Sequence, residues 1–125
     1  MNILIVDDTP DLREVYILHL TKSLGQKYCF FTAKDGEEGV KKALEIETQH
    51  GGLGLVISDY DMPKLNGIQM KANIDCELKR SIPGILVTSY EEELMTHKSL
   101  FHAYIQKPII DYEEMAKIIK KLEAK

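Results

Sequence analysis

Five short apolar segments, separated by stretches of helical periodicity, are the feature of this sequence that most limits its possible folds. The segments are residues 2–6, 28–33, 53–58, 85–88 and 103–106. Several are rich in β-branched residues, and none alternates polar with apolar positions, which is typical of strands covered on both faces of a sheet. We therefore expect a parallel sheet of five strands with helices on both sides.

Helical patterns fill the intervals between these strands. Thr9 and Pro10 offer a cap and a first-turn proline for a helix that runs to about Ser23, and further helices are expected over residues 36–49 and 67–80. Asp111 caps a final amphipathic helix. The apolar stripes expected on the four helices are Leu12, Val15, Tyr16, His19 and Leu20; Val40, Ala43 and Leu44; Met70, Ile74 and Leu78; and Met115, Ile118, Ile119 and Leu122.

Residues 91–100 carry a weaker pattern, in which we expect a short helix. The order is then strand followed by helix, repeated five times. Right-handed crossovers fold such a (βα)5 chain into a doubly wound α/β domain of three layers. Because 125 residues is the usual length of one domain, residues 1–125 are expected to form a single unit.

Charge and hydropathy exclude several classes of function. Twenty acidic and sixteen basic residues give a formal net charge of −4, without a basic stretch dense enough to follow a phosphate backbone, so no direct contact with nucleic acid is expected. No apolar run approaches the roughly 20 residues of a membrane span, and the first residues lack the pattern of a secretory signal. The domain is expected to be cytoplasmic.

Polar side chains follow four of the five predicted strands at the point where each ends. They are Asp7 and Asp8, Asp59, Thr88 and Ser89, and Lys107 before Pro108. In an open parallel sheet, the carboxyl ends of the strands are where ligands bind. Any one aspartate could simply be a turn former or a helix cap, but that explanation covers neither the doubled acid nor the lysine.

Carboxylates gathered in one place repel one another unless a cation shares the site. Oxygen ligands without a nearby histidine or cysteine favour Mg²⁺ or Mn²⁺ over zinc, and such an ion keeps positions open for phosphoryl oxygens. Lys107 would add a positive charge and Thr88 a hydroxyl donor, which are the groups that phosphoryl transfer requires. Asp59 is then the candidate nucleophile.

Five motifs in order, ILIVDD, AKDGEEG, ISDYDMPKLNG, ILVTS and YIQKP, resemble the receiver domain of two-component response regulators, and in particular the chemotaxis regulators. The resemblance covers essentially the whole chain. It implies a flavodoxin-like fold with the strand order 2-1-3-4-5. It also implies that Asp59 is the phosphoacceptor, Asp8 a direct Mg²⁺ ligand, Asp7 an acid acting largely through water, and Asp61 a ligand through its backbone carbonyl.

The resemblance further identifies Thr88 as the switch hydroxyl, Lys107 as the lysine that pairs with the phosphoryl group, and Tyr104 as the switch aromatic. It implies Mg²⁺-dependent transfer from a histidine kinase or a histidine phosphotransfer domain. The altered face, from the fourth helix to the fifth, would then regulate an output domain or partner protein. Such a domain accepts and loses a phosphoryl group itself and is not a turnover enzyme.

The sequence departs from the family pattern between Thr88 and Lys107, a span that is a few residues short, so the fourth helix is expected to be truncated. Asp61 and Tyr90 occupy positions that, by resemblance, tune the lifetime of the phosphoryl group. Two other readings remain open. One is a haloacid-dehalogenase-like phosphatase that uses Asp59 and Asp61 as its DxD pair; the other is an interaction module that works without phosphorylation.

Overall fold

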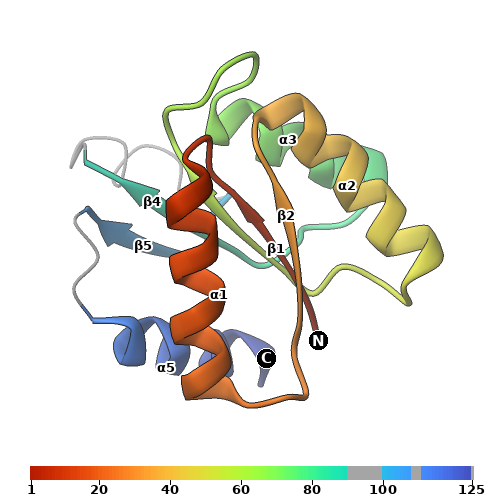
Figure 1. The fold of residues 1–125 in the computed structure, drawn as a ribbon. Helices are drawn as coiled ribbons and strands as arrows, with labels where there is room; N and C mark the ends of the chain where they lie inside the picture. Colours follow the sequence, from red (N-terminus) through yellow and green to blue (C-terminus); the bar gives the residue numbers. More distant parts are fainter. Residues whose placement is uncertain (90–99, 108–110, 125) are drawn as a thin grey trace.

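The computed structural model describes residues 1–89, 100–107 and 111–124. Its elements are β1 (Asn2–Val6), α1 (Pro10–Leu24), β2 (Cys29–Ala33), α2 (Gly36–Gln49), β3 (Leu55–Asp59), α3 (Gly67–Leu78), β4 (Gly84–Thr88), β5 (Ala103–Gln106) and α5 (Tyr112–Glu123). The strands form one parallel sheet in the order β2-β1-β3-β4-β5, as expected (Figure 1). The α/β class and the flavodoxin-like strand order are thus confirmed.

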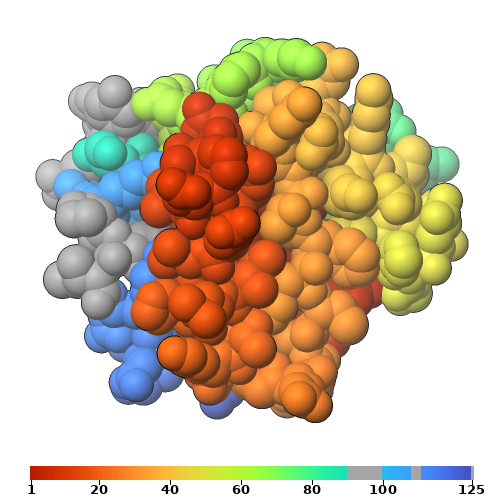
Figure 2. Space-filling view, viewed as in Figure 1, coloured from red at the N-terminus to blue at the C-terminus, as the bar shows by residue number. Residues whose placement is uncertain are grey.

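Helices cover the sheet on both faces. The α1 and α5 helices contact each other and share an apolar core with one face of the sheet, whereas α2 and α3 contact each other over the opposite face (Figure 1). In the space-filling view, α1 lies across the middle of the visible face with α5 beside it (Figure 2). Apolar residues of the strands alternate between the two cores, which makes the domain three layers thick.

The expectation that every strand is covered on both faces holds only for the inner ones. All residues of β3 and β4 are buried, as are four of the five in β1. By contrast, most positions of β2 and β5 are partly or fully exposed, because these strands form the two edges of the sheet. The sequence pattern identified the strands but did not distinguish inner from edge positions.

Three local predictions for the helices differ from the structure in detail. Thr9 is the N-cap residue of α1 and Pro10 begins the helix, as predicted, but the Thr9 side chain makes no capping hydrogen bond, and its backbone N–H donates to Asp7 Oδ1 at 2.9 Å. Leu44, expected on the apolar stripe of α2, is 44% exposed, and Ile46 is fully buried in its place. The α3 helix ends at Leu78, two residues earlier than predicted, where Lys79 adopts a left-handed conformation that closes the helix.

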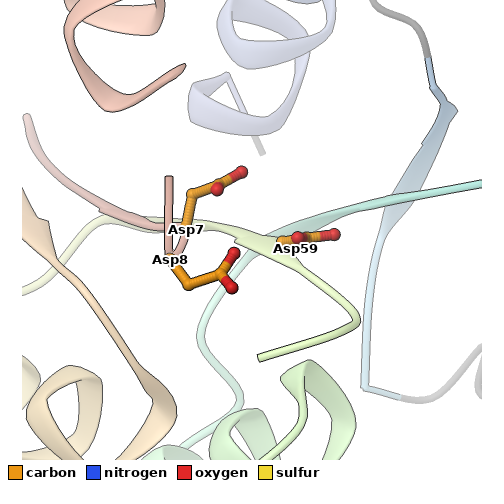
Figure 3. Close-up of side chains that lie close together, drawn as sticks. All are labelled: Asp7, Asp8 and Asp59. Atoms are coloured by element: carbon orange, nitrogen blue, oxygen red, sulfur yellow. The ribbon is translucent and has the colours of Figure 1, made fainter. Parts of the chain in front are cut away.

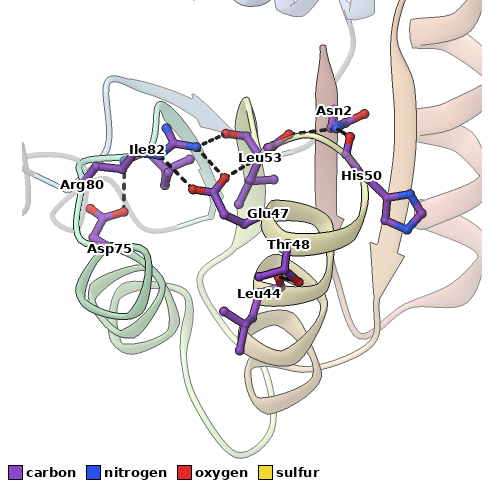
Figure 4. Close-up of polar contacts among 10 residues, drawn as sticks. Asn2, Leu44, Glu47, Thr48, His50, Leu53, Asp75, Arg80 and Ile82 are labelled. Carbon is purple, nitrogen blue, oxygen red and sulfur yellow. Dashed lines mark hydrogen bonds and ion pairs between the residues drawn. The ribbon is translucent and has the colours of Figure 1, made fainter.

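A polar network fixes the end of the sheet opposite the strands' carboxyl ends (Figure 4). The guanidinium of Arg80, after α3, donates to both carboxylate oxygens of Glu47 on α2 and to the Leu53 carbonyl, with Nη2 2.8 Å from Glu47 Oε1. Glu47 also accepts from the Leu53 N–H at 2.9 Å. Asn2 donates to the carbonyls of His50 and Gly52, both at 2.8 Å. The network joins α2, α3 and the approach to β3.

The expected short helix over residues 91–100 falls almost wholly outside the described residues, and so do Tyr90 and Pro108. Within the described part of the chain, none of the helices has both the length and the apolar character needed to cross a membrane.

Candidate functional site

Three aspartates meet at the carboxyl ends of β1 and β3 (Figure 3). Asp7 and Asp8 directly follow β1, and Asp59 is the last residue of β3. The two strands are neighbours, with Val6 paired to Ser58, so the chain direction brings all three residues to the same edge. One carboxylate oxygen from each lies within 4.8 Å of the others. The sequence prediction that these side chains converge is confirmed.

The three carboxylates differ in their environments. Asp7 is fully buried and Asp59 is 6% exposed, while Asp8 is open to solvent. Burial raises the pKa of Asp59 above that of an ordinary aspartate, and the negative charge of Asp7 raises it further. Contact with Lys107 acts in the opposite direction without cancelling the effect of burial. Asp59 is therefore a carboxylate held in an environment that disfavours its charge.

Lys107 approaches this cluster from the end of β5. Its Nζ lies 3.1 Å from Asp59 Oδ2 and 3.9 Å from Asp7 Oδ2, so a single ammonium group faces two buried acids. The lysine is placed by its own backbone, since its N–H donates to the Thr88 carbonyl at 2.9 Å in continuation of the β4–β5 ladder. Lys107, and Arg13 at the Asp7 backbone, leave the three carboxylates with a negative excess among the residues that the structure describes.

The donor set fits a hard divalent cation. Asp7 Oδ2 is buried and accepts a hydrogen bond from none of the described residues, although a buried carboxylate oxygen is normally paired. Its counter-charge is Lys107, at an ion-pair distance of 3.9 Å. The cluster offers only oxygen atoms, which are the ligands preferred by Mg²⁺ and Mn²⁺. A bound cation would relieve both the repulsion and the unpaired oxygen.

The other predicted residues lie at the same edge or close to it. Thr88, the last residue of β4, is buried, and the strand pairing of Asp59 with Val87 places Thr88 one residue beyond the level of Asp59. Tyr104 lies within β5, and its hydroxyl is buried without a hydrogen-bond partner among the described residues. Asp61 is exposed in the β3–α3 loop, and its carboxylate is not among the three that lie within 4.8 Å of one another.

Two residues near the site were not singled out as functional from the sequence. Arg13, in the first turn of α1, donates from its guanidinium to the Asp7 carbonyl and so fixes the backbone at the end of β1. Tyr16, one turn further, is buried, and its pKa is raised by burial and by the charges of Asp7 and Asp59. Their position in the sequence could have indicated both residues, because a helix that starts directly after β1 brings its first two turns beside the end of that strand.

Close backbone packing sets the floor of the site at the start of α3. A Cβ atom on Gly67 would lie 2.4 Å from the Asp59 carbonyl oxygen, so only glycine fits there. The Gly67 N–H donates to the Tyr60 carbonyl at 2.8 Å, and the Ser58 hydroxyl donates to the Asp59 carbonyl at 2.8 Å. Glycine at position 67 therefore lets α3 begin directly against the end of β3.

Comparison with known proteins identifies the relatives of this chain. The family model described as the response regulator receiver domain matches residues 3–120. A chemotaxis protein CheY homolog from Campylobacter jejuni is 30% identical over 112 residues, which cover 86% of this chain and 82% of the relative.

Solved structures give the same result. The response regulator protein TrrA from Thermotoga maritima, in complex with Mg²⁺ and BeF, has a TM-score of 0.79 and 30% identity over 97% of each chain. A chain of the CheX–CheY–BeF3–Mg²⁺ complex from Borrelia burgdorferi has a TM-score of 0.78 and 26% identity, covering all of this chain and 90% of that one.

Proposed function

Because the chain belongs to the response regulator receiver domain family, a signalling domain of two-component systems, we propose that it accepts a phosphoryl group on Asp59. The observation that carries the proposal is the contact of Lys107 Nζ with Asp59 Oδ2 at 3.1 Å, inside a cluster of three carboxylates. Acid and lysine come from strands that only the fold brings together. A purely structural ion pair would not require the two further aspartates beside it.

The transfer step follows from this geometry. A carboxylate oxygen of Asp59 attacks the phosphorus of a phosphohistidine, forming an O–P bond as the P–N bond breaks. The electron pair of that bond passes to the imidazole nitrogen, which is protonated from water. Lys107, already at contact distance from Asp59, pairs with the oxygens of the arriving group. Water later hydrolyses the aspartyl phosphate, so the domain is an acceptor and not a turnover enzyme.

The acidic cluster would hold Mg²⁺, or Mn²⁺ in its place, through Asp8, Asp59 and the backbone carbonyl of Asp61, with Asp7 acting largely through water. When bound, the cation supplies positive charge that offsets the repulsion between the carboxylates and the incoming phosphoryl oxygens. The solved structure of TrrA is a complex with Mg²⁺ and BeF, which supports cation binding by a chain with this fold.

Signalling would depend on a shift between two conformations. The phosphoryl oxygens recruit the hydroxyl of Thr88 and the ammonium of Lys107, and the ring of Tyr104 follows the threonine. The buried Tyr104 hydroxyl, unpaired among described residues, supports a side chain able to exchange partners. The donor would be a histidine kinase or a histidine phosphotransfer domain in the cytoplasm. The face that changes, from the expected fourth helix to α5, would contact an output domain or a partner protein. A CheY–CheX complex from Borrelia burgdorferi supports a partner protein of this kind.

Intact-mass spectrometry with acetyl phosphate tests the proposal. With Mg²⁺, we expect the wild-type protein to gain the mass of one phosphoryl group, and to lose the gain when EDTA is added first. The Asp59→Asn variant should gain nothing, whereas Asp61→Asn, an identical change at an exposed position, should still be labelled. Absence of the adduct in the wild type would contradict the proposal and leave a phosphorylation-independent interaction module.

The same preparation separates the receiver from a phosphatase of the haloacid-dehalogenase type. Such an enzyme would need Asp61 as an acid or base next to Asp59, yet the Asp61 side chain is exposed while Asp59 is buried. We therefore expect no sustained release of phosphate from p-nitrophenyl phosphate, a phosphomonoester. Continuous turnover on that substrate, abolished by Asp61→Asn, would contradict the receiver function.

A further inference from the structure

The motif AKDGEEG, at the junction of β2 and α2, has no role in the proposed chemistry. We propose that its Asp35 and Gly36 are positioning residues that hold the β3–α3 loop, residues 60–66, and thereby set the affinity of the acidic site for a divalent cation. The inference rests on the proposed function, because that loop carries the Asp61 carbonyl. It assigns to the start of α2 a part in cation binding without direct contact with the cation.

Gly36 is in direct contact with the loop. A Cβ atom at this position would lie 2.4 Å from the carbonyl oxygen of Leu65 and 2.5 Å from its Cβ, both far below an ordinary contact. The obstructing atoms belong to the loop backbone, or are fixed to it, so no side-chain rotation could relieve the overlap. The first turn of α2 and the loop are thus packed backbone against backbone, which only glycine permits.

Asp35 links the same two segments through its side chain. It is the N-cap of α2, and its Oδ1 accepts from the Glu38 N–H at 2.8 Å. Its other oxygen, Oδ2, lies 3.9 Å from Nζ of Lys64 in the loop. Although Lys64 is largely exposed, the side chain of Asp35 is only 8% exposed. A single buried carboxylate therefore serves both the helix and the loop.

The loop needs such support because its tip is strained. Lys64 has a φ of 72°, a left-handed backbone conformation that residues other than glycine adopt only at a cost in free energy. The Leu65 N–H donates to the Pro63 carbonyl at 2.9 Å, so these three residues form a tight γ-turn. Strained turns of this kind persist only where neighbouring structure holds them. Asp35 and Gly36 contact the two residues, Lys64 and Leu65, at which the turn is made.

The base of the loop is fixed by the contact of Gly67 with the Asp59 carbonyl and by the 2.8 Å hydrogen bond from the Gly67 N–H to Tyr60. Asp61 lies between this fixed base and the buttressed tip. Because only three residues separate Asp61 from Leu65, a displacement of Leu65 would also move the Asp61 carbonyl. Because Mg²⁺ requires nearly ideal octahedral geometry, a small movement of one ligand lowers its affinity.

Isothermal titration of the whole chain with MgCl2 tests the inference, with folding monitored by thermal unfolding. Gly36→Ala should weaken Mg²⁺ binding by about tenfold or more, the usual effect of losing a group that orients a ligand. Gly39→Ala is the matched control: its Cβ would lie 2.4 Å from Met70 Sδ, a flexible side chain in the core, and the three nearest atoms belong to Met70 and Val6 and not to the loop. It should lower Tm yet leave the Kd for Mg²⁺ within about twofold of wild type.

Asp35→Asn provides a second variant that keeps an N-cap but loses the charge facing Lys64. We expect it to weaken Mg²⁺ binding by roughly twofold to fivefold, the scale of an exposed ion pair, and this result decides the matter if Gly36→Ala does not fold. If Gly36→Ala, or Asp35→Asn where Gly36→Ala does not fold, binds Mg²⁺ with the same Kd as the wild type, the inference is overturned and the proposed function is not. The inference is also overturned if Gly39→Ala loses as much Mg²⁺ affinity as that variant. A wild type that binds no Mg²⁺ would overturn the proposed function and the inference together.

Discussion

At the scale of the single residue, the central feature is a carboxylate placed where its charge is unfavourable. Asp59 is 6% exposed, lies within 4.8 Å of two other acids, and has a pKa raised chiefly by burial. Such a group gains from any positive charge brought to the site, whether Lys107 or a divalent cation. The same arrangement that costs stability in the folded protein thus provides the affinity for the ligands of the proposed reaction.

Replacing this residue should therefore stabilise the protein. Because the pKa of Asp59 is higher in the folded than in the unfolded state, its contribution to stability is greatest below the unfolded pKa and is lost as pH rises through the folded pKa. At pH 7, without divalent cations, we expect Asp59→Asn to be more stable by on the order of 1 kcal/mol. The advantage should disappear as the solution is acidified and the wild-type carboxyl takes up its proton.

Urea unfolding at a series of pH values measures this difference, and Asp61→Asn is the control because the same change is made at an exposed side chain. The control should change the free energy of unfolding at pH 7 by less than about 0.5 kcal/mol, the usual range for a substitution at an exposed side chain. An Asp59→Asn variant that is less stable at neutral pH would contradict the account, because the ion pair with Lys107 would then outweigh the cost of burial.

At the scale of the element, a largely buried ion pair lies where α3 meets the start of β4. Lys71 is fully buried, and its Nζ lies 2.9 and 2.8 Å from the two carboxylate oxygens of Asp75, one turn further along α3. Asp75 Oδ1 also accepts from the Ile82 N–H at 3.1 Å, ahead of β4. The lysine stem fills the space left by Gly84, with Cε 2.9 Å from the position of a Cβ there. Burial lowers the pKa of Lys71, and Asp75 opposes that change.

The two halves of this pair should respond differently to substitution. Asp75→Ala leaves a buried ammonium without its counter-ion and the Ile82 N–H without its acceptor, so we expect a loss of about 3 kcal/mol in the free energy of unfolding. Lys71→Met keeps the length of the stem, and Asp75, which is 17% exposed, retains water and Ile82 as partners. Its cost should stay below about 1 kcal/mol.

Chemical denaturation of both single variants and of the double variant gives the comparison. The double variant Lys71→Met/Asp75→Ala should recover most of what Asp75→Ala loses, since the unpaired charge is gone. Equal losses in the two single variants would show that the pair contributes attraction and not merely compensation for burial.

At the scale of the whole molecule, the site exists because a parallel sheet brings the ends of β1, β3, β4 and β5 to one edge. This convergence could be predicted from sequence, since strand periodicity and the polar residues after each strand are both local signals. Asp7, Asp8, Asp59 and Lys107 were found in this way and do lie together. The predictions of Asp59 as nucleophile and of Lys107 as its positive partner came from the chemistry of these side chains, whereas the separate roles of Asp7 and Asp8 toward a cation came from the resemblance to receiver domains.

The features that could not be predicted depend on contacts that leave no periodic pattern in the sequence. Two of these features are contacts between different elements: the hydrogen bond from Arg80 to Glu47 and the close approach of Gly36 to Leu65. The third, the exposure of Leu44, follows from how α2 is rotated on the sheet. Thr9 illustrates the same limit locally: its side chain is suited to capping a helix but makes no capping hydrogen bond, while its backbone N–H donates to Asp7 Oδ1. Propensity describes what a residue can do, whereas packing decides what it does.

The central claim, that these converging strands make Asp59 the acceptor, is tested most directly by locating the phosphoryl group. After reaction with acetyl phosphate and Mg²⁺, borohydride reduction converts an aspartyl phosphate into homoserine, which peptide mass spectrometry assigns to one position. We expect homoserine at residue 59 and at none of residues 7, 8 or 61, with no conversion when EDTA is present. Homoserine at any of those other aspartates, or none at residue 59 in a fully folded protein, would contradict that claim.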